Sequence, residues 1–360
     1  MKLKTMLSVR LAVLLSCAVS PSLFAWDYEG HRAVNQIALA SLPTNFPAFV
    51  FTPEARERVA FLAGEADRWR NSQDYTFQHL NEPDHFLDLD FLADYGFNAT
   101  NTPAFRYDFV GAIVLARAKN PGLEPQVDTE KDTKHTQQFF GFLPWAINEN
   151  YSKLKSEFSY LKTFQQNGGT PDEIKNAQEN ILYVMGQMGH YAGDASQPLH
   201  ATKHHHGWVG ANPKGYTTKR NFHSQIDGGY FAKTKLDVKM DLLPLVKPAH
   251  AIADANAGNL GVFQPVMDFI AGTGQLVEPL YEMEKAGKLS GEGTVGLEGK
   301  PFLHEQLLRG GQFLGALWLT AYETAPEDSF LKTQLTKRAK AAAEKTAPEK
   351  TAEPKATEAK

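Results

Sequence analysis

The sequence predicts an all-α protein, a single mainly helical domain with long loops. Apolar residues recur at helical spacing in several stretches, helix-start signals precede some of them, and strand signals are weak and short. The 360 residues, 42% hydrophobic and 22% charged, have ordinary globular composition without an internal repeat. This length is sufficient for one large core.

Residues 1–25 are expected to be a secretory signal peptide rather than part of the fold. The basic start MKLKTMLSVR precedes the apolar run LAVLLSCAVS and a small residue, Ala25. This order is typical of a cleaved leader, with cleavage before Trp26, and it predicts a secreted or periplasmic protein. A lipoprotein site at Cys17 is the alternative, disfavoured because the second Leu of LLSC fits it poorly. Cys17 is the only cysteine, so the core, metal or both must hold the cleaved protein.

Several stretches predict helices in order along the chain. HRAVNQIALASL, residues 31–42, has apolar residues at helical spacing. The next helix is expected to begin after Thr52, an N-cap followed by Pro53, and to run through TPEARERVAFLAGEADRWR. Later helices are expected at Val262–Glu284 and Glu305–Tyr322.

The most informative helix signal opens with a capping box. Thr170 and Glu173 flank Pro171 at the first helical position. The first half of this helix is amphipathic, whereas from Ile181 onward ILYVMGQMGHYAGD is apolar on nearly all sides, which indicates a buried helix. Pro198 is expected to end it and turn the chain.

The stretch from Lys332 to Lys360 is expected to be a disordered tail, because it lacks aromatic residues and consists largely of Lys, Ala, Glu, Thr and Pro. The tail carries a net charge of +4 and the leader +3. Taking both from the chain's −4 leaves −11 for residues 26–331. An acidic body argues against tight binding of duplex nucleic acid through its phosphates. It is compatible with a local cationic site made by metal ions.

Two histidine–aspartate pairs have the i, i+4 spacing that places both side chains on one helix face. His190 and Asp194 lie in the buried helix end, and His223 and Asp227 lie in NFHSQID. Burying an imidazole and a carboxylate is costly unless each finds a partner, and a zinc ion satisfies both. With His200 between the pairs, this mixed set without cysteine is typical of hydrolytic zinc sites. For any single residue, the alternative is a hydrogen-bonded core histidine or a capping aspartate.

Five segments then occur in the order found in a known family. They are WDYEGH, AGEADRWR, HFLDLD, GHYAGDASQPLH and NFHSQID, and they span Trp26 to Asp227. In this combination the chain resembles the S1/P1 nuclease family, within the zinc-dependent phospholipase C/P1 nuclease superfamily. The resemblance implies a mainly helical catalytic domain of that type over residues 26–331.

The resemblance also implies three zinc ions, Zn²⁺, with the following ligands. One ion would be held by Asp67, His85, His190 and Asp194. A second would be held by His200, His223 and Asp227. The third would take the α-amino group and carbonyl of Trp26, with His31 and a shared Asp194. Because that amine exists only after cleavage, the uncleaved chain is expected to lack a complete site.

The implied activity is hydrolysis of single-stranded DNA and RNA to 5′-phosphates by a zinc-activated hydroxide, with 3′-nucleotidase activity as a further expectation. Arg70 matches a basic residue beside the phosphate; the alternative is a solvated helix charge. Asp88 matches a carboxylate that orients or deprotonates the water; the alternative is a partner that orients a zinc-bound histidine. Phe86 could stack on a base, the alternative being a core aromatic. Asn212 is the candidate for holding the nucleobase.

The sequence departs from the family pattern in the interval before His223. The family's GGN stretch is replaced by ATKHHHGWVGANPKGYTTKR, and its HxxWD by HSQID, with Ile226 in place of Trp. A phospholipase C acting on phospholipid is therefore the alternative enzyme, although the W-x4-H spacing favours the nuclease. Trp208, Val209 and Tyr216 would then form an apolar wall. A non-catalytic zinc-binding protein is the third hypothesis, and a monomer without an obligate protein partner is expected. Residues 204–206, all histidine, are expected to be solvated or at the substrate's edge rather than to hold a fourth metal ion.

Overall fold

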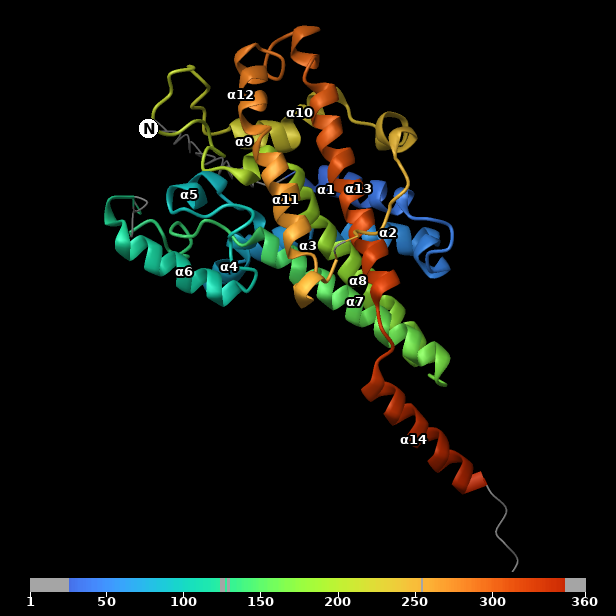
Figure 1. Ribbon diagram of the computed structural model, residues 1–360. Helices are drawn as coiled ribbons and strands as arrows, with labels where there is room; N and C mark the ends of the chain where they lie inside the picture. Colours follow the sequence, from blue (N-terminus) through green and yellow to red (C-terminus); the bar gives the residue numbers. More distant parts are fainter. Residues whose placement is uncertain (1–25, 124–126, 128–129, 254, 347–360) are drawn as a thin grey trace, which may run out of the picture.

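The computed structural model describes residues 26–123, 127, 130–253 and 255–346. Every regular element in these ranges is helical and no strand occurs in them, which confirms the all-α class (Figure 1). The expected signal peptide, Cys17 within it, and residues 347–360 lie outside the described residues. Within the described residues, no helix has both the length and the apolar character needed to cross a membrane.

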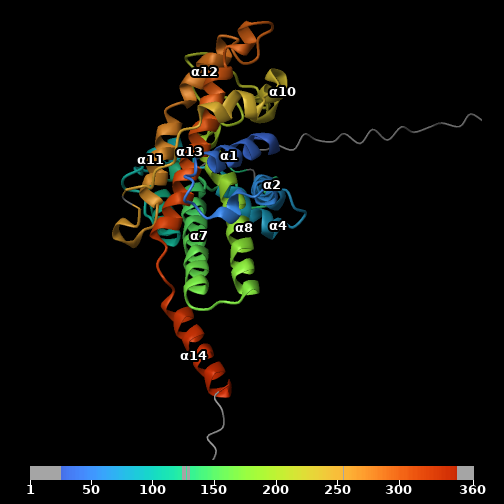
Figure 2. The same ribbon diagram turned by 90° about the vertical axis from the view of Figure 1, so that its right-hand side faces the viewer.

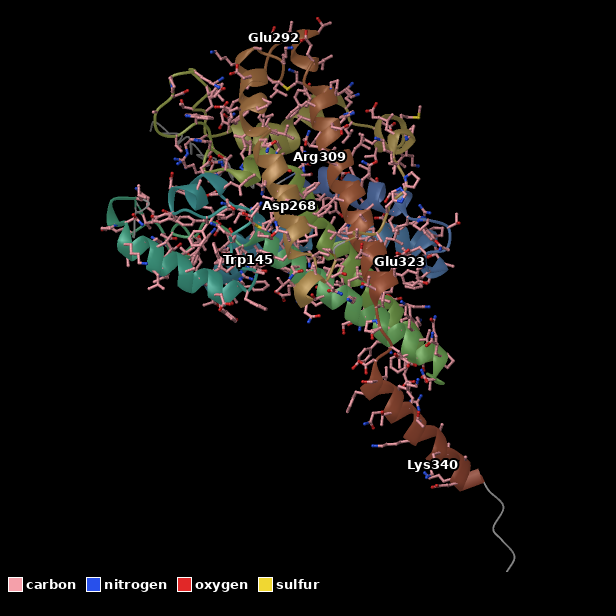
Figure 3. The ribbon with its side chains drawn as sticks, in the orientation of Figure 1. Trp145, Asp268, Glu292, Arg309, Glu323 and Lys340 are labelled. Carbon is pink, nitrogen blue, oxygen red and sulfur yellow. The ribbon has the colours of Figure 1, made fainter. Side chains whose placement is uncertain are left out.

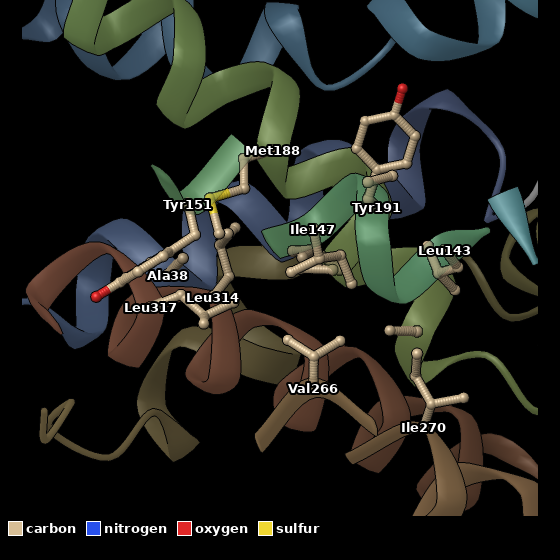
Figure 4. Packing of buried hydrophobic residues seen from close by; sticks show 14 of the residues in the cluster. Ala38, Leu143, Ile147, Tyr151, Met188, Tyr191, Val266, Ile270, Leu314 and Leu317 are labelled. Atoms are coloured by element: carbon tan, nitrogen blue, oxygen red, sulfur yellow. The ribbon is translucent and has the colours of Figure 1, made fainter. Parts of the chain in front are cut away.

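Four long helices form the centre of the protein: α1 (Tyr28–Ser41), α7 (Leu143–Gln166), α8 (Pro171–Ser196) and α13 (Lys300–Thr324). Helices α7 and α8 lie side by side and are joined by a short connection (Figure 2). Helix α13 packs on α1, α7 and α8. Figure 4 shows where these helices meet α11 (Phe263–Gly274) in the core, at Ala38, Ile147, Met188, Val266 and Leu314.

Glycines let the central helices approach closely. A Cβ atom added to Gly311 of α13 would overlap Cγ2 of Ile37 and would lie 2.9 Å from the carbonyl oxygen of Val34. A Cβ atom added to Gly189 of α8 would overlap the side-chain oxygen of Asn35. Since α1 is thereby held against both α8 and α13, its side chains are fixed relative to the buried end of α8.

The start and end of α8 agree with those predicted from the sequence. The Thr170 hydroxyl accepts a hydrogen bond from the Glu173 backbone at 3.2 Å, and the Glu173 carboxylate accepts one from the Thr170 backbone at 2.7 Å. The helix ends at Ser196, and η4 (Pro198–Ala201) follows at once. Every residue from Met188 to Ser196 is buried, as expected for the apolar end.

Two expected helices are each divided. The stretch after Thr52 forms α2 (Pro53–Leu62) and α3 (Glu65–Arg70), separated at residues 63–64. The stretch expected at Val262–Glu284 forms α11 (Phe263–Gly274) and α12 (Val277–Lys285). The first break leaves the Ala63 carbonyl free of the helical ladder, and His190 binds it.

The remaining elements are shorter than α7, α8 and α13. The other α-helices are α4 (Tyr75–Asn81), α5 (Leu89–Asp94), α6 (Arg106–Lys119), α9 (Phe222–Ser224) and α10 (Tyr230–Thr234). The single-turn segments are η1 (Ala48–Phe51), η2 (Glu82–His85), η3 (Pro121–Leu123), η5 (Gln225–Gly229), η6 (Val238–Leu242), η7 (Leu243–Leu245), η8 (Ala257–Asn259) and η9 (Val295–Leu297). Segment η5 is a π turn, a form that is frequent at functional sites.

The expectation of disorder from Lys332 is wrong for the described part of that stretch. Helix α14 (Ser329–Thr346) extends away from the bundle, and the side chain of Lys340 lies on this separate segment (Figures 1 and 3). Leu335 is buried, and Arg338 donates to the Glu173 carboxylate at 2.7 Å. The composition that resembles a disordered tail is also rich in Ala and Lys, which are strong helix formers, and the first proline comes only at Pro348.

Candidate metal centre

The histidines and aspartates predicted as ligands come from seven helical segments and meet in three groups. Within each group, ligand atoms lie within 4.8 Å of one another. The groups are His31, His190 and Asp194; Asp67, His85 and His190; and His200, His223 and Asp227. All of these side chains are buried except His223, whose side chain is 12% exposed. All eight predicted side-chain ligands are therefore brought together.

His190 belongs to two groups and connects them. Its Nε2 atom lies 3.0 Å from Nδ1 of His85, 3.4 Å from Oδ2 of Asp194 and 3.8 Å from Oδ1 of Asp67. Oδ1 of Asp194 lies 3.5 Å from Nε2 of His31. Asp194 thus offers one oxygen toward His85 and His190 and the other toward His31.

The third group lies next to the first two. Nε2 of His223 is 2.9 Å from Nε2 of His200 and 3.1 Å from Oδ2 of Asp227. Nδ1 of His200 lies 3.8 Å from Oδ1 of Asp194, the same oxygen that faces His31. The three groups consequently form one continuous cluster rather than three separate sites.

Hydrogen bonds to the outer edges of the ligands fix their orientation. Nδ1 of His190 binds the Ala63 carbonyl at 2.7 Å, and Nδ1 of His200 binds the His85 carbonyl at 2.5 Å, so the Nε2 atoms face the cluster. Gln197 donates to Oδ1 of Asp227 at 2.6 Å and leaves Oδ2 toward His223. Such outer partners are usual for metal-binding histidines and carboxylates. Gln197 was not predicted from the sequence, although its place between Asp194 and His200 was a signal.

The electrostatics of the cluster favour a bound cation. Burial, reinforced by Asp67, raises the pKa of Asp194 well above its usual value, and burial likewise raises the pKa of Asp227. Burial lowers the pKa of His85 and of His223. In the absence of a cation, low-dielectric surroundings disfavour every charged form of these groups. A metal ion supplies the positive charge that lets buried carboxylates ionise beside neutral imidazoles.

The residues fit a divalent metal ion geometrically. In a tetrahedral site with bonds of about 2.0–2.1 Å, ligand atoms lie about 3.3 Å apart. The separations around Nε2 of His190 and His223 run from 2.9 to 3.8 Å. Oδ1 of Asp194 is buried and accepts no hydrogen bond from the residues that the structure describes. A metal ion would satisfy this oxygen and the facing imidazole nitrogens together.

Trp26 and Arg70 both lie at the cluster. The Trp26 indole donates to the Gly193 carbonyl at 2.9 Å, immediately before Asp194, and its ring is fully buried. Nε of Arg70 lies 2.7 Å from Oδ1 of Asp67. Burial would lower the pKa of Arg70, but Asp67, Asp194 and other carboxylates outweigh it and raise the pKa. Because this side chain is only 15% exposed, Arg70 is not the solvated helix charge of the alternative interpretation.

Asp88 and Phe86 occupy the segment that follows His85. The Asp88 carboxylate is buried, and burial together with Asp90 raises its pKa well above the usual value. The half-buried Phe86 ring lies against Gly141. The charges that act on Asp88 are those of Asp90 and Lys203, which belong to none of the three groups. The predicted roles of Asp88 and Phe86 in catalysis and base stacking stay predictions.

The loop before His223 is more ordered than the sequence suggests. Asn212 donates to the Tyr216 carbonyl and accepts from the Tyr216 backbone N–H, both at 2.8 Å, so its amide closes the loop. A role for Asn212 in substrate binding stays a prediction. His204 is buried and stacks on Trp208 with 3.9 Å between ring centres, so the expectation of a solvated or substrate-edge residue is wrong for His204. Trp208 and Tyr216 both pack on Tyr281, as part of the interior.

Comparison of the chain with protein-family models and with curated proteins found no match. The functional inference therefore rests on the geometry of the His and Asp cluster. What it shows is a buried cluster of histidines and aspartates that can bind metal ions.

Proposed function

We propose that the protein is a zinc-dependent phosphodiesterase that holds three zinc ions and cleaves single-stranded DNA and RNA to 5′-phosphates, as the resemblance to S1/P1 nucleases implies. One observation carries the proposal: eight His and Asp side chains from seven segments form one continuous cluster through His190 and Asp194. A structural zinc site needs only about four ligands, fewer than the eight that meet here. Zinc sites built without cysteine are typically catalytic rather than structural. When bound, zinc supplies Lewis acidity that polarises a phosphodiester and lowers the pKa of water.

The chain's own residues would orient the substrate. Arg70 keeps its positive charge, and its guanidinium lies at the cluster through Asp67. A guanidinium can bind two phosphate oxygens at once, which positions a diester for in-line attack. Gln197 and the Ala63 carbonyl hold Asp227 and His190 in place, so these ligands need little reorganisation.

The position of Trp26 supports two parts of the proposal: that a third zinc ion is bound and that the protein is exported. Its indole is anchored on Gly193, and the Asp27 backbone donates to the Asp227 carbonyl at 3.2 Å. These contacts hold the main chain of Trp26 near the cluster, where a free α-amine after leader cleavage would serve as a ligand. We therefore propose that the active form begins at Trp26 and acts outside the cytoplasm.

The function is tested by incubating the zinc-loaded, leader-free protein with denatured DNA, RNA and phosphatidylcholine. We expect cleavage of both nucleic acids with 5′-phosphate ends, and loss of this activity in Asp194→Asn but not in Asp172→Asn. Asp172 lies on the same helix but at its exposed start. Turnover of phosphatidylcholine alone would replace the nuclease by a phospholipase C. Tight zinc binding without any turnover would support a non-catalytic zinc protein.

One observation favours the phospholipase alternative. Helix α6 exposes an apolar face, with Tyr107 88%, Val114 60% and Leu115 64% exposed, and Phe105 precedes it at 64%. Contiguous exposed apolar residues are typical of surfaces that meet a membrane or another protein. The phosphatidylcholine arm of the experiment, with the substrate presented in vesicles, tests this alternative directly.

A further inference from the structure

His205 and His206 lie beside the metal cluster but belong to none of its three groups. The ring centre of His206 is 5.3 Å from that of His223, and the ring centre of His205 is 6.2 Å from it. Among the residues that the structure describes, no set of three close ligand atoms includes either histidine.

The two histidines differ in their hydrogen bonding. Nδ1 of His205 binds the Thr202 carbonyl at 3.2 Å, and the ring meets His206 edge-on, with 4.6 Å between ring centres. Nδ1 of His206 is buried and makes no hydrogen bond to any residue in the described part of the chain. An unpartnered buried nitrogen is costly, so a ligand atom or ordered water is expected next to it. His205 thus packs against His206, whose Nδ1 atom is available to form a hydrogen bond.

The charges near His206 are positive. Burial, together with the charges of His205, Arg220 and Arg70, lowers the pKa of His206 to about 4, so both guanidiniums act on this ring. Arg220 is exposed, at the rim of the loop that leads into His223. In a body with a net charge of −11 over residues 26–331, such a place attracts an anion.

We propose that His206 and Arg220 form a subsite for a second phosphate of the substrate, next to the group of His200, His223 and Asp227. This inference rests on the proposed phosphodiesterase function and narrows its substrate. A nucleic acid strand carries a phosphate on each side of every internal nucleoside, whereas a phospholipid such as phosphatidylcholine carries a single diester phosphate. Arg220 would bind the second phosphate through its guanidinium, and His206 through a ring N–H.

The test compares two substrates of the zinc-loaded, leader-free protein: the dinucleotide TpT, with one phosphate, and the trinucleotide TpTpT, with two. We expect kcat/KM for TpTpT to exceed that for TpT by about tenfold or more, the effect of a hydrogen bond to a charged group. Arg220→Gln and His206→Phe should lose most of this preference while their kcat/KM for TpT stays within about twofold of wild type. Lys219→Gln and His250→Phe are matched controls at exposed positions and should keep the preference.

A binding measurement separates failure of the subsite from failure of the proposed function. Stopped-flow anisotropy of fluorescein-labelled TpTpT, recorded before turnover, gives affinity as a function of salt. The slope of log K against log[salt] should be smaller by about 0.7 in Arg220→Gln, as for one lost phosphate contact. If wild type cleaves neither substrate, the nuclease proposal fails, and the subsite is then judged by this slope alone. Equal slopes for wild type and Arg220→Gln, or a TpTpT preference retained by Arg220→Gln, would overturn the subsite.

Discussion

His190 and Asp194 lie one turn apart on α8, with Nε2 of His190 3.4 Å from Oδ2 of Asp194. Because Nδ1 of His190 is bound to the Ala63 carbonyl, only Nε2 is directed toward a metal ion. A single imidazole nitrogen binds one ion, so His190 cannot serve both of its groups at the same time. The carboxylate of Asp194, with two oxygens facing different neighbours, is the group able to connect two ions.

Replacing Asp194 by Asn should remove at least one ion. The substitution keeps the shape of the side chain but removes the negative charge that two neighbouring ions would share. We expect at least one zinc ion fewer per chain by mass spectrometry of the metal content, and activity on denatured DNA reduced by about a hundredfold or more. Asp172→Asn should retain full metal content. Unchanged zinc binding in Asp194→Asn would mean that the cluster does not use this carboxylate.

Removing metal should destabilise the protein strongly. The described residues contain no cysteine, so buried imidazoles and carboxylates lose their partner without any cross-link to compensate. Each site filled at a hundred times its Kd contributes about 2.7 kcal/mol, so chelation should lower Tm by several degrees or more. Differential scanning calorimetry with and without EDTA measures this, and restoring zinc should recover the original Tm. A Tm unaffected by chelation would exclude structural occupancy of the cluster.

An extra residue before Trp26 should weaken the site selectively. A protein beginning Met-Trp26 lacks the free α-amine at Trp26, while the indole contact with Gly193 can persist. We expect about one zinc ion less per chain and about tenfold or greater loss of activity, with α-helical circular dichroism unchanged. Full zinc content and activity in this extended protein would show that the amine of Trp26 is not a ligand.

Two glycine substitutions should have opposite effects on stability. Gly311→Ala places a methyl group against Ile37 and should cost about 1–3 kcal/mol through overpacking. Gly111→Ala, on the exposed side of α6 with no atom within 4 Å of the new methyl group, should stabilise by about 0.5–1 kcal/mol. Urea unfolding of the metal-free proteins measures both free energies. Destabilisation by Gly111→Ala would argue that this face of α6 is covered.

The contact between α14 and the bundle should be sensitive to acid. Hydrogen bonds from Arg338 and from the Thr170 backbone lower the pKa of Glu173 to about 2, from an ordinary value of 4.5. A depressed carboxyl pKa stabilises the folded state above about pH 4.5, and the contribution is lost as the pH falls toward 2. Arg338→Gln should raise the pKa of Glu173 measured by NMR of its carboxyl carbon, whereas Lys175→Gln should shift it much less. An unchanged pKa in Arg338→Gln would show that the ion pair does not form in solution.

Local spacing predicted that His190 lies beside Asp194 and that His223 lies beside Asp227, whereas the resemblance to a known family supplied the expectation that Asp67, His85 and His31 lie with them. His190 and Asp194 share a helix face by spacing alone, and a buried imidazole beside a buried carboxylate requires a partner. What could not be predicted depends on contacts between distant segments. The break at residues 63–64 frees the Ala63 carbonyl for His190, a contact across 127 positions of sequence. Burial of His204 depends on its stacking with Trp208, within a loop whose conformation no periodic pattern indicates.

The expectation of disorder was wrong for α14 for a different reason. Its composition satisfies the criteria for a disordered tail, but the same residues are good helix formers, and Leu335 gives the helix an anchor on the bundle. Composition alone cannot distinguish these outcomes, because the decision depends on whether a neighbouring surface accepts the one apolar side chain.

The direction of α14 has a practical consequence for handling the protein. The Trp26 side chain is fully buried beside Asp194, so an affinity label attached ahead of it would disturb the candidate metal cluster. Helix α14 instead projects from the bundle with Lys337, Lys340 and Lys345 exposed along it. A label attached through these amines, unlike one placed ahead of Trp26, would lie on the segment that projects from the bundle.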